Sequence, residues 1–445
     1  MARITLHLNG RPAELEGRER ASLLEALRAA GLSGAKEGCG EGECGACTVV
    51  VRDARGYRAV NSCLVPLAAV AGGEVWTVEG LGEPGSGAHP VQQAVVAEGA
   101  VQCGYCTPGV VMSLFAGYYA GDPLGTVEGN LCRCTGYRPI RDAARHLGDP
   151  APGDPFLRRL SLPPPQPGPW YGQQFMRPTG LAEALALLAE PGSRPVAGAT
   201  DLALAADPGP RWVSLEAVPE LRGLAREPQA VVIGAALPLA DLGAMLGEGW
   251  PFLRPWLAVF ASPAIRNRAT LGGNLATASP IGDSAPLLLV LDAVLRLRRA
   301  GGERTVPLPA FFRDYRRTVL EPGEIIAAVA VPLPLPQEVR FYKVAKRPRD
   351  DISTVAAAFA LSRDAGGRVQ TVRMAFGGVA ATPVRATAAE AVLQGRAWTP
   401  AAVAEARAVL GRSFRPLSDL RGSSAYRQAL VVNLWDRFVE EVQGP

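Results

Sequence analysis

The eight cysteines of this 445-residue chain all lie between Cys39 and Cys134, and no cysteine follows Cys134. A secreted protein held by disulfides is usually small and carries an export signal. This chain is long, and its first residues, "MARITLHLNG", alternate apolar and polar side chains as a strand does and contain no export signal. We therefore expect a cytoplasmic protein whose clustered thiols stay reduced and bind metal.

The first group of cysteines has the spacing of a plant-type ferredoxin. Cys39-x4-Cys44-x2-Cys47 is followed, after fifteen residues, by Cys63, which is the ligand pattern of a [2Fe–2S] cluster. The thiolates can converge only if the loop curls tightly. Glycines allow the positive φ angles of such a curl and leave backbone N–H groups facing an anionic cluster. The glycines to which we assign this role are Gly38, Gly40, Gly42 and Gly45.

The second group is Cys103-x2-Cys106 with Cys132-x-Cys134, and each pair stands just before a predicted helix. The positive end of a helix favours thiolates. A C-x-C pair is tight for one tetrahedral zinc but suits one iron of a two-iron cluster. Two four-cysteine zinc sites, or buried free thiols, are the alternatives, and the residues alone leave both open.

Composition indicates a globular chain, with 48% hydrophobic and 20% charged residues. The net charge is +4 and positive and negative residues are interspersed, so the sequence shows no basic patch typical of nucleic-acid binding. No apolar run approaches the ~20 residues of a membrane span. Periodicity predicts a β-rich start, with a hairpin at Asn9-Gly10 and a helix capped by Ser22, and then a mostly helical region. A Pro-rich linker in extended form follows at 149–170, then alternating strands and helices, and a smaller α+β unit from about residue 336.

At these motifs the chain resembles the molybdenum hydroxylase family. "GCGEGECGACTVVV" with "NSCL", and "QCGYCTPGVVMS" with "GNLCRCTGYRPI", are similar to that family's paired [2Fe–2S] domains. "RPVAGATDL" and "TLGGNLATASPIGDSAP" are similar to the two flavin-binding segments of its FAD domain. The resemblance implies a multidomain α+β fold with a ferredoxin-like β-grasp domain at 1–74, a helical-bundle [2Fe–2S] domain at 75–148, a linker at 149–170, a two-part FAD-binding domain at 171–335 and a C-terminal α+β domain at 336–445.

The resemblance also implies which residues bind FAD, and their chemistry agrees with it. Small residues after an apolar strand can turn their N–H groups toward a pyrophosphate, and Asp283 can accept hydrogen bonds from a ribityl or ribose hydroxyl. Each glycine-rich loop taken alone is equally an ordinary turn. The expected contacts are Val196, Ala197, Gly198, Ala199, Thr200, Asp201 and Leu202 at the pyrophosphate, Thr270, Gly273, Asn274, Thr277, Ser279 and Asp283 as a second wall, and Phe260, Ile325 and Ile326 as apolar contacts.

Two further residues match positions beside the flavin in this family. Lys343 corresponds to a lysine near the isoalloxazine ring, where a cation stabilises the charge of a reduced flavin; the alternative is a solvated surface lysine. Tyr315 corresponds to an aromatic on the nicotinamide side, and the alternative is a half-buried core tyrosine. "KRPRDD" at 346–351 is either a phosphate-facing segment for NAD or a charged surface turn.

The function that the resemblance implies is electron transfer. The chain ends at Pro445 without the family's molybdopterin domains, so we expect an iron–sulfur/FAD subunit whose molybdenum-binding partner hydroxylates the substrate. We expect a heterodimer that pairs into a heterotetramer. The presence of the iron–sulfur part and the flavin part on one chain favours the xanthine dehydrogenase branch of the family. In that branch hypoxanthine or xanthine is oxidised to urate, with NAD⁺ as acceptor. The alternatives are the corresponding subunit of an aldehyde, carbon monoxide or N-heterocycle oxidoreductase, a stand-alone NADH-oxidising reductase, and a zinc-structured scaffold.

Overall fold

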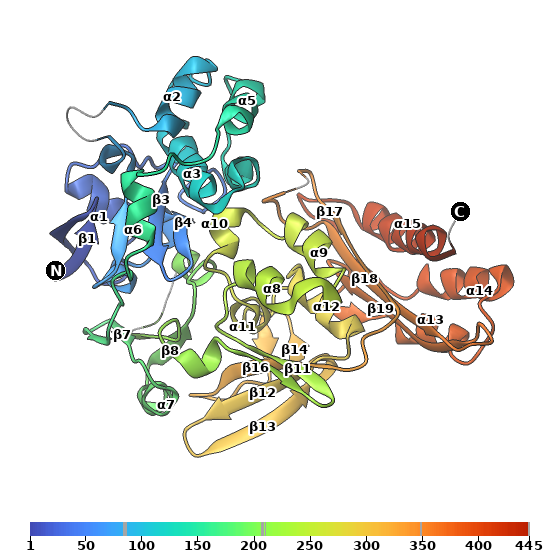
Figure 1. Ribbon diagram of the computed structural model, residues 1–445. Helices are drawn as coiled ribbons and strands as arrows, with labels where there is room; N and C mark the ends of the chain where they lie inside the picture. Colours follow the sequence, from blue (N-terminus) through green and yellow to red (C-terminus); the bar gives the residue numbers. More distant parts are fainter. Residues whose placement is uncertain (83–86, 206–208, 210, 348, 444–445) are drawn as a thin grey trace. The chain divides into compact units, whose positions relative to one another are not determined.

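The computed structural model describes residues 1–82, 87–205, 209, 211–347 and 349–443, and it divides into two compact units (Figure 1). The first unit contains residues 1–219, 238–240 and 261–269, and the second contains residues 220–237, 241–260 and 270–445.

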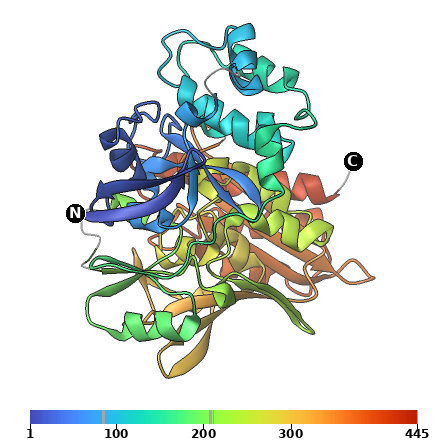
Figure 2. The ribbon, with the colours of Figure 1, turned by 60° about the vertical axis from the view of Figure 1, so that its left-hand side comes forward.

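The first unit begins with a five-stranded sheet in the order β2-β1-β5-β3-β4. Its strands are β1 (Ala2–Leu8), β2 (Arg11–Gly17), β3 (Thr48–Asp53), β4 (Gly56–Asn61) and β5 (Glu74–Trp76). The predicted hairpin is confirmed, because Asn9 and Gly10 have φ angles of 52° and 82° and join β1 to β2 (Figure 2). The predicted helix is also confirmed: in α1 (Leu23–Ala29) the Ser22 hydroxyl accepts a hydrogen bond from the Glu25 N–H.

Helices form the next part of the first unit. They are α2 (Pro90–Ala97), α3 (Thr107–Ala120), α4 (Pro123–Thr126) and α5 (Arg138–His146). Helix α3 is buried along most of its length, with Val110, Leu114 and Phe115 at most 1% exposed. It is therefore the centre of the core in this part of the unit.

The linker is not extended throughout, contrary to the prediction. Residues Pro155–Leu160 form helix α6, because the Asp154 carboxylate accepts a 2.8 Å hydrogen bond from the Leu157 N–H and Pro155 suits the first helical position. Phe156 is 9% exposed and packs its ring edge-on against Phe115. The linker is thus anchored on the helical part.

A small four-stranded sheet completes the first unit, in the order β6-β7-β9-β8. Its elements are β6 (Trp170–Tyr171), β7 (Phe175–Arg177), α7 (Leu181–Ala189), β8 (Ser193–Val196) and β9 (Arg211–Ser214), and α10 (Pro263–Arg266) belongs to the same unit. Strands β7 and β8 run parallel to β9. The predicted pyrophosphate segment therefore leaves the carboxyl end of a parallel strand.

The second unit has one five-stranded sheet in the order β10-β11-β16-β12-β13. Its strands are β10 (Leu224–Glu227), β11 (Ala230–Gly234), β12 (Val294–Arg299), β13 (Gly302–Pro307) and β16 (Ile325–Pro332), and a hairpin is formed by β14 (Phe312–Asp314) and β15 (Arg317–Thr318). The accompanying helices are α8 (Leu239–Leu246), α9 (Leu253–Val259), α11 (Leu271–Ala276) and α12 (Ser284–Val290).

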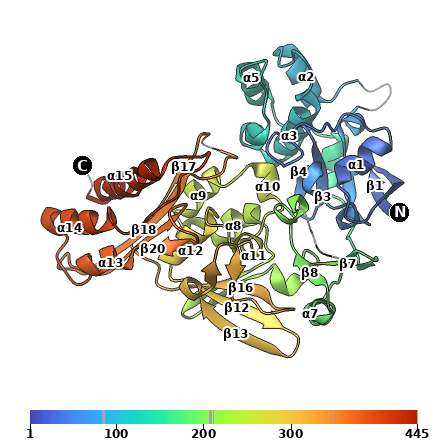
Figure 3. The same ribbon diagram turned by 180° about the vertical axis from the view of Figure 1, so that it is seen from behind.

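A four-stranded antiparallel sheet follows, in the part of the chain where the sequence predicts a smaller α+β unit. It consists of β17 (Glu338–Val344), β18 (Val355–Arg363), β19 (Val369–Gly377) and β20 (Val384–Arg385), followed by α13 (Thr387–Leu393), α14 (Pro400–Leu410) and α15 (Ser424–Gln443). These last three helices cover one face of the sheet, and α12 lies on the other (Figures 1 and 3). None of the helices in the described part of the chain is both long and apolar enough to cross a membrane.

Candidate functional site

The first cysteine group lies where the first sheet meets the loop after α1. Cys47 directly precedes β3, and Cys63 lies in a short 3₁₀ turn directly after β4. The pairing of Thr48 with Asn61 brings these two ends together, and the Cys63 thiol hydrogen-bonds to Cys47. This hydrogen bond lowers the pKa of Cys47 to about 7, which favours the thiolate that metal binding requires.

Backbone amides face the other two sulfurs of this group. The Cys39 N–H lies 3.4 Å from Cys44 Sγ and the Glu41 N–H lies 3.3 Å from Cys39 Sγ. Of the four glycines expected to curl the loop, Gly40, Gly42 and Gly45 have φ angles of 71°, 82° and 67°.

Gly38 is the exception, because its φ is not positive. It is required for space: a Cβ at this position would lie 2.7 Å from Cys44 Sγ. The positive φ expected of Gly38 from the sequence was therefore wrong.

The second cysteine group surrounds the start of α3. Cys134 Sγ lies 3.3 Å from Cys103 Sγ, and Cys106 hydrogen-bonds to Cys132. Cys103 and Cys134 are exposed, whereas Cys132 is buried. The Thr107 hydroxyl, next to Cys106, is buried and has no hydrogen-bond partner in the described part of the chain. An acceptor bound by these thiols would satisfy it.

The thiols are arranged in twos rather than in fours. Among the described residues, no three cysteine, histidine, aspartate or glutamate side chains converge as they would around a single metal ion. A structural zinc needs four ligands at one point, whereas a two-iron cluster can take one thiol pair on each iron. The donor sets therefore fit two [2Fe–2S] clusters better than two zinc ions.

The two cysteine loops contact each other directly. The Leu131 N–H donates a 2.9 Å hydrogen bond to the Cys44 carbonyl oxygen, and the Asn130 amide donates one of 3.0 Å to the Gly45 carbonyl oxygen. A Cβ at Gly109, in the first turn of α3, would lie 2.1 Å from that same Gly45 oxygen. Sequence reasoning missed this contact; the only local sign of it is a glycine inside an apolar helix.

The segment after β8 has the backbone expected of an anion site. The N–H groups of Gly198, Ala199 and Thr200 have no hydrogen-bond acceptor in the described residues, and Ala199 has a φ of 62°. Consecutive free N–H groups in such a conformation form an anion-binding concavity. Arg268, which sequence reasoning missed, donates a 3.1 Å hydrogen bond to the Gly198 carbonyl and pairs with Glu216 at 2.7 Å.

The predicted second wall lies in the other compact unit. Thr270 is the N-cap of α11, with its hydroxyl accepting a 3.0 Å hydrogen bond from the Gly273 N–H. Asn274 Oδ1 accepts a 3.3 Å hydrogen bond from the Ser284 N–H. The apolar residues predicted to flank the flavin, Phe260, Ile325 and Ile326, are all buried.

Asp283 and Lys343 form a buried ion pair. Lys343 Nζ lies 2.9 Å from Asp283 Oδ2, and the side chains are 3% and 9% exposed. The other carboxylate oxygen of Asp283 accepts a 2.5 Å hydrogen bond from Ser353. The alternative of a solvated surface lysine is thus excluded. Tyr315 lies in the β14–β15 turn and is 59% exposed, so the alternative of a core tyrosine is excluded as well.

Four domain families match consecutive parts of the chain. Their descriptions are "2Fe-2S iron-sulfur cluster binding domain" for residues 6–68, "[2Fe-2S] binding domain" for 77–145, "FAD binding domain in molybdopterin dehydrogenase" for 171–334 and "CO dehydrogenase flavoprotein C-terminal domain" for 340–442.

Whole proteins and solved structures are similar as well. The xanthine dehydrogenase of Emericella nidulans is 33% identical over 99% of this chain, and the chain spans only 38% of that protein's length. A carbon monoxide dehydrogenase chain from Hydrogenophaga pseudoflava is 31% identical with a TM-score of 0.55, covering 60% of this chain and 96% of its own. A quinoline 2-oxidoreductase chain from Pseudomonas putida 86 is 28% identical with a TM-score of 0.56, covering 61% of this chain and 96% of its own.

Proposed function

The chain belongs to the molybdenum hydroxylase family, and from this we propose that it is the electron-transfer subunit of such an enzyme. Its cofactors are two [2Fe–2S] clusters and FAD, which between them convert single-electron steps into a two-electron step. The eight cysteines hold the clusters in two groups of four. The FAD contacts are those listed from the sequence, with the free N–H groups of 198–200 binding the pyrophosphate.

The observation that carries this proposal is the contact between the two cysteine loops. The Leu131 N–H to Cys44 carbonyl bond places the residue before Cys132 against a ligand of the other group. Two redox groups held by touching loops are close enough to exchange electrons through the protein. Isolated metal sites that serve only to stabilise a fold do not require such a contact.

The exposure of the thiols supports a direction for the electrons. Two thiols of the second group, Cys103 and Cys134, are exposed, whereas in the first group only Cys39 is exposed. The second group therefore presents more of its edge to a partner. We propose that a separate molybdenum-binding chain docks there and hydroxylates the substrate. The second group accepts the electrons, the first group passes them to FAD, and NAD⁺ is the final acceptor. We also propose that Lys343 and Tyr315 lie beside the flavin. The complex is proposed to be a cytoplasmic heterotetramer.

For the substrate we propose a purine, with the complex acting as a xanthine dehydrogenase. The similarity to a xanthine dehydrogenase along 99% of this chain supports it. The quinoline 2-oxidoreductase and carbon monoxide dehydrogenase chains are similar in structure, with TM-scores of 0.56 and 0.55. An N-heterocycle or carbon monoxide is therefore the second candidate substrate.

Cys132→Ser in the full complex tests the order of the relay. We expect about two of about four irons to be lost, since each cluster carries two, while FAD is retained. Xanthine-dependent NAD⁺ reduction should stop, while NADH oxidation by an artificial dye, which needs only the flavin, should persist. Unchanged xanthine turnover would refute the relay. In the complex without the substitution, reduction of the clusters by quinoline or carbon monoxide but not by xanthine would refute only the purine assignment.

A further inference from the structure

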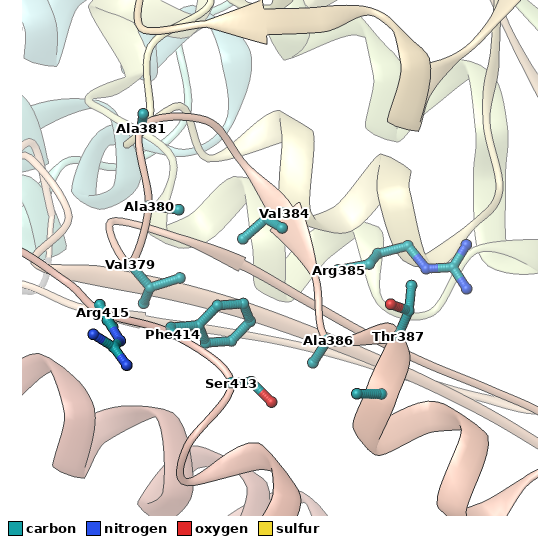
Figure 4. A pocket seen from close by; sticks show the side chains of 11 residues that line it. Val379, Ala380, Ala381, Val384, Arg385, Ala386, Thr387, Ser413, Phe414 and Arg415 are labelled. Carbon is teal, nitrogen blue, oxygen red and sulfur yellow. The ribbon is translucent and has the colours of Figure 1, made fainter.

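A pocket of about 510 Å³ lies in the C-terminal part of the second unit (Figure 4). Its walls come from the loop after β19, from β20, from the start of α13 and from the loop after α14. It contains none of the residues assigned above to a cluster or to FAD. Neither the proposed electron transfer nor the packing of the sheet accounts for it.

The floor of the pocket is apolar and partly buried. Val379 and Ala386 are 1% and 2% exposed. The Phe414 ring lies in the middle of the lining, and it packs edge-on against Phe376 at a centroid distance of 5.4 Å (Figure 4). A flat apolar group is the kind of ligand that such a floor accommodates.

The charge of the lining is positive. Two arginines and no acidic residue line the pocket, and they lie on opposite sides of Phe414 (Figure 4). Arg385 is neutralised by Glu390 at 2.6 Å and Asp292 at 2.9 Å. Arg415 is exposed and makes no hydrogen bond or ion pair with any residue that the structure describes. One positive charge is therefore left beside an apolar floor.

From this combination we propose that the pocket binds a small amphipathic anion, with a flat apolar body on Phe414 and a carboxylate paired with Arg415. An arginine binds a carboxylate through two parallel hydrogen bonds, which fixes the orientation of the ligand. The pocket volume is within the range of small-molecule sites. An aromatic carboxylate is the class of ligand that can both pack on the Phe414 ring and pair with the Arg415 guanidinium.

Calorimetric titration of the full chain with benzoate tests this proposal, and benzylamine serves as the cationic probe of the same shape. We expect benzoate to bind in the millimolar range, as so small a ligand should, and benzylamine to bind at least about tenfold more weakly. Arg415→Glu should weaken benzoate binding at least about tenfold. Arg415→Lys should weaken binding less than Arg415→Glu, by up to about fivefold, because the charge is kept while the second of the two parallel hydrogen bonds is lost.

Two controls make the test specific to the pocket. Arg412→Glu makes the same charge change at an exposed residue outside the lining and should alter benzoate affinity less than about twofold. Ala381→Trp, at an exposed position of the lining, should abolish binding by filling the space. Equal affinity for benzoate and benzylamine, equal losses in Arg412→Glu and Arg415→Glu, or no binding at about 10 mM benzoate would each overturn the proposal.

Discussion

The backbone N–H of Leu131 donates a 2.9 Å hydrogen bond to the carbonyl oxygen of Cys44. Leu131 directly precedes Cys132, so this bond joins the loop of one cysteine group to the loop of the other. Asn130, which is 5% exposed, adds a second bond to Gly45 next to it. The two loops are therefore one packed body, and a change that separates them should damage both groups.

Gly109→Ala should separate the loops. The added Cβ would lie 2.1 Å from the Gly45 carbonyl oxygen, and no side-chain rotation can relieve a clash with backbone. We expect the free energy of unfolding to fall by about 2–4 kcal/mol and the iron content of both groups to fall. Urea unfolding and the electron paramagnetic resonance signals of the two reduced clusters measure this. Gly148→Ala is the control, since its Cβ would have no heavy atom of the described residues, apart from its chain neighbours, within 4 Å. Equal behaviour of the two variants would contradict the packing argument.

Glu74→Gln should destabilise the first unit strongly. Glu74 is fully buried and pairs with Arg52 at 2.9 Å and Arg159 at 2.6 Å. Burial by itself would raise the pKa of the Glu74 carboxyl, but the hydrogen bonds from Arg159 and Arg52 outweigh it and hold the pKa below its usual range. Neutralising this carboxylate leaves Arg52 buried without a counter-charge, which costs about 3–5 kcal/mol.

Urea unfolding at pH 7 compares this variant with Glu16→Gln. Glu16 pairs with Arg3 on the surface, where the two side chains are 63% and 74% exposed, so its loss should cost less than about 1 kcal/mol. Because the pKa of Glu74 is lower in the folded state, its charge stabilises the fold at pH values above the pKa of glutamate in the unfolded chain. This stabilisation is lost as the pH falls through the pKa of Glu74 in the folded state. The gap between the two variants should therefore narrow in acid. A constant gap would show that packing, not charge, is responsible.

His89 should make the stability of the helical part depend on pH. Burial lowers its pKa to about 4, and its Nδ1 accepts a 3.2 Å hydrogen bond from the Val91 N–H as the N-cap of α2. The unfolded chain binds more protons between about pH 6.5 and 4, so the free energy of unfolding should fall as the pH falls through that range. The total loss should be on the order of 3 kcal/mol.

His89→Asn isolates this contribution, because asparagine caps a helix but does not titrate in this range. Thermal unfolding of both proteins from pH 8 to pH 4 should give a clearly smaller pH slope for the variant. The comparison at pH 8 measures the packing that the substitution removes. Parallel pH profiles would show that another group controls the acid response.

Local signals explain what the sequence predicted correctly. Asn9-Gly10 and Ser22 act within a few residues of themselves, and the spacing of the first three cysteines is confined to one loop. A helix in the linker was also signalled locally, by Asp154 followed by Pro155, but the prolines around it indicated an extended chain. In this segment the cap at Asp154, and not the proline content, determines the local structure.

Contacts between distant parts of the chain leave no such pattern. The bonds of Leu131 to Cys44, of Arg268 to Gly198 and of Ser353 to Asp283 each join segments far apart in sequence. Gly38 shows a related limit: its sequence context is the same whether a glycine is needed for a positive φ or, as here, for space beside Cys44. Residue types therefore identified the candidate site, and only the structure shows what holds it together.

Lys343→Met should reveal whether this lysine serves the fold, the flavin or both. Its Nζ lies 2.9 Å from Asp283 Oδ2 and both side chains are buried, so removing the cation leaves an uncompensated carboxylate and should cost about 3–5 kcal/mol. The double variant Lys343→Met/Asp283→Asn removes both charges and should recover more than half of that loss. Urea unfolding of the single and double variants gives the coupling between the two residues.

The flavin of the double variant separates the two roles. If Lys343 also stabilises the reduced flavin, as we propose, the double variant should bind FAD with a reduction potential below that of the single variant Asp283→Asn, which lacks the same proposed FAD contact. Lys346→Met is the matched control, because Lys346 is exposed and, among the residues that the structure describes, its Nζ bonds only to a backbone carbonyl, that of Leu420 at 3.2 Å. A double variant with restored stability and the same flavin potential as Asp283→Asn would limit Lys343 to its ion pair with Asp283. The flavin would then take its electrostatic environment from other residues.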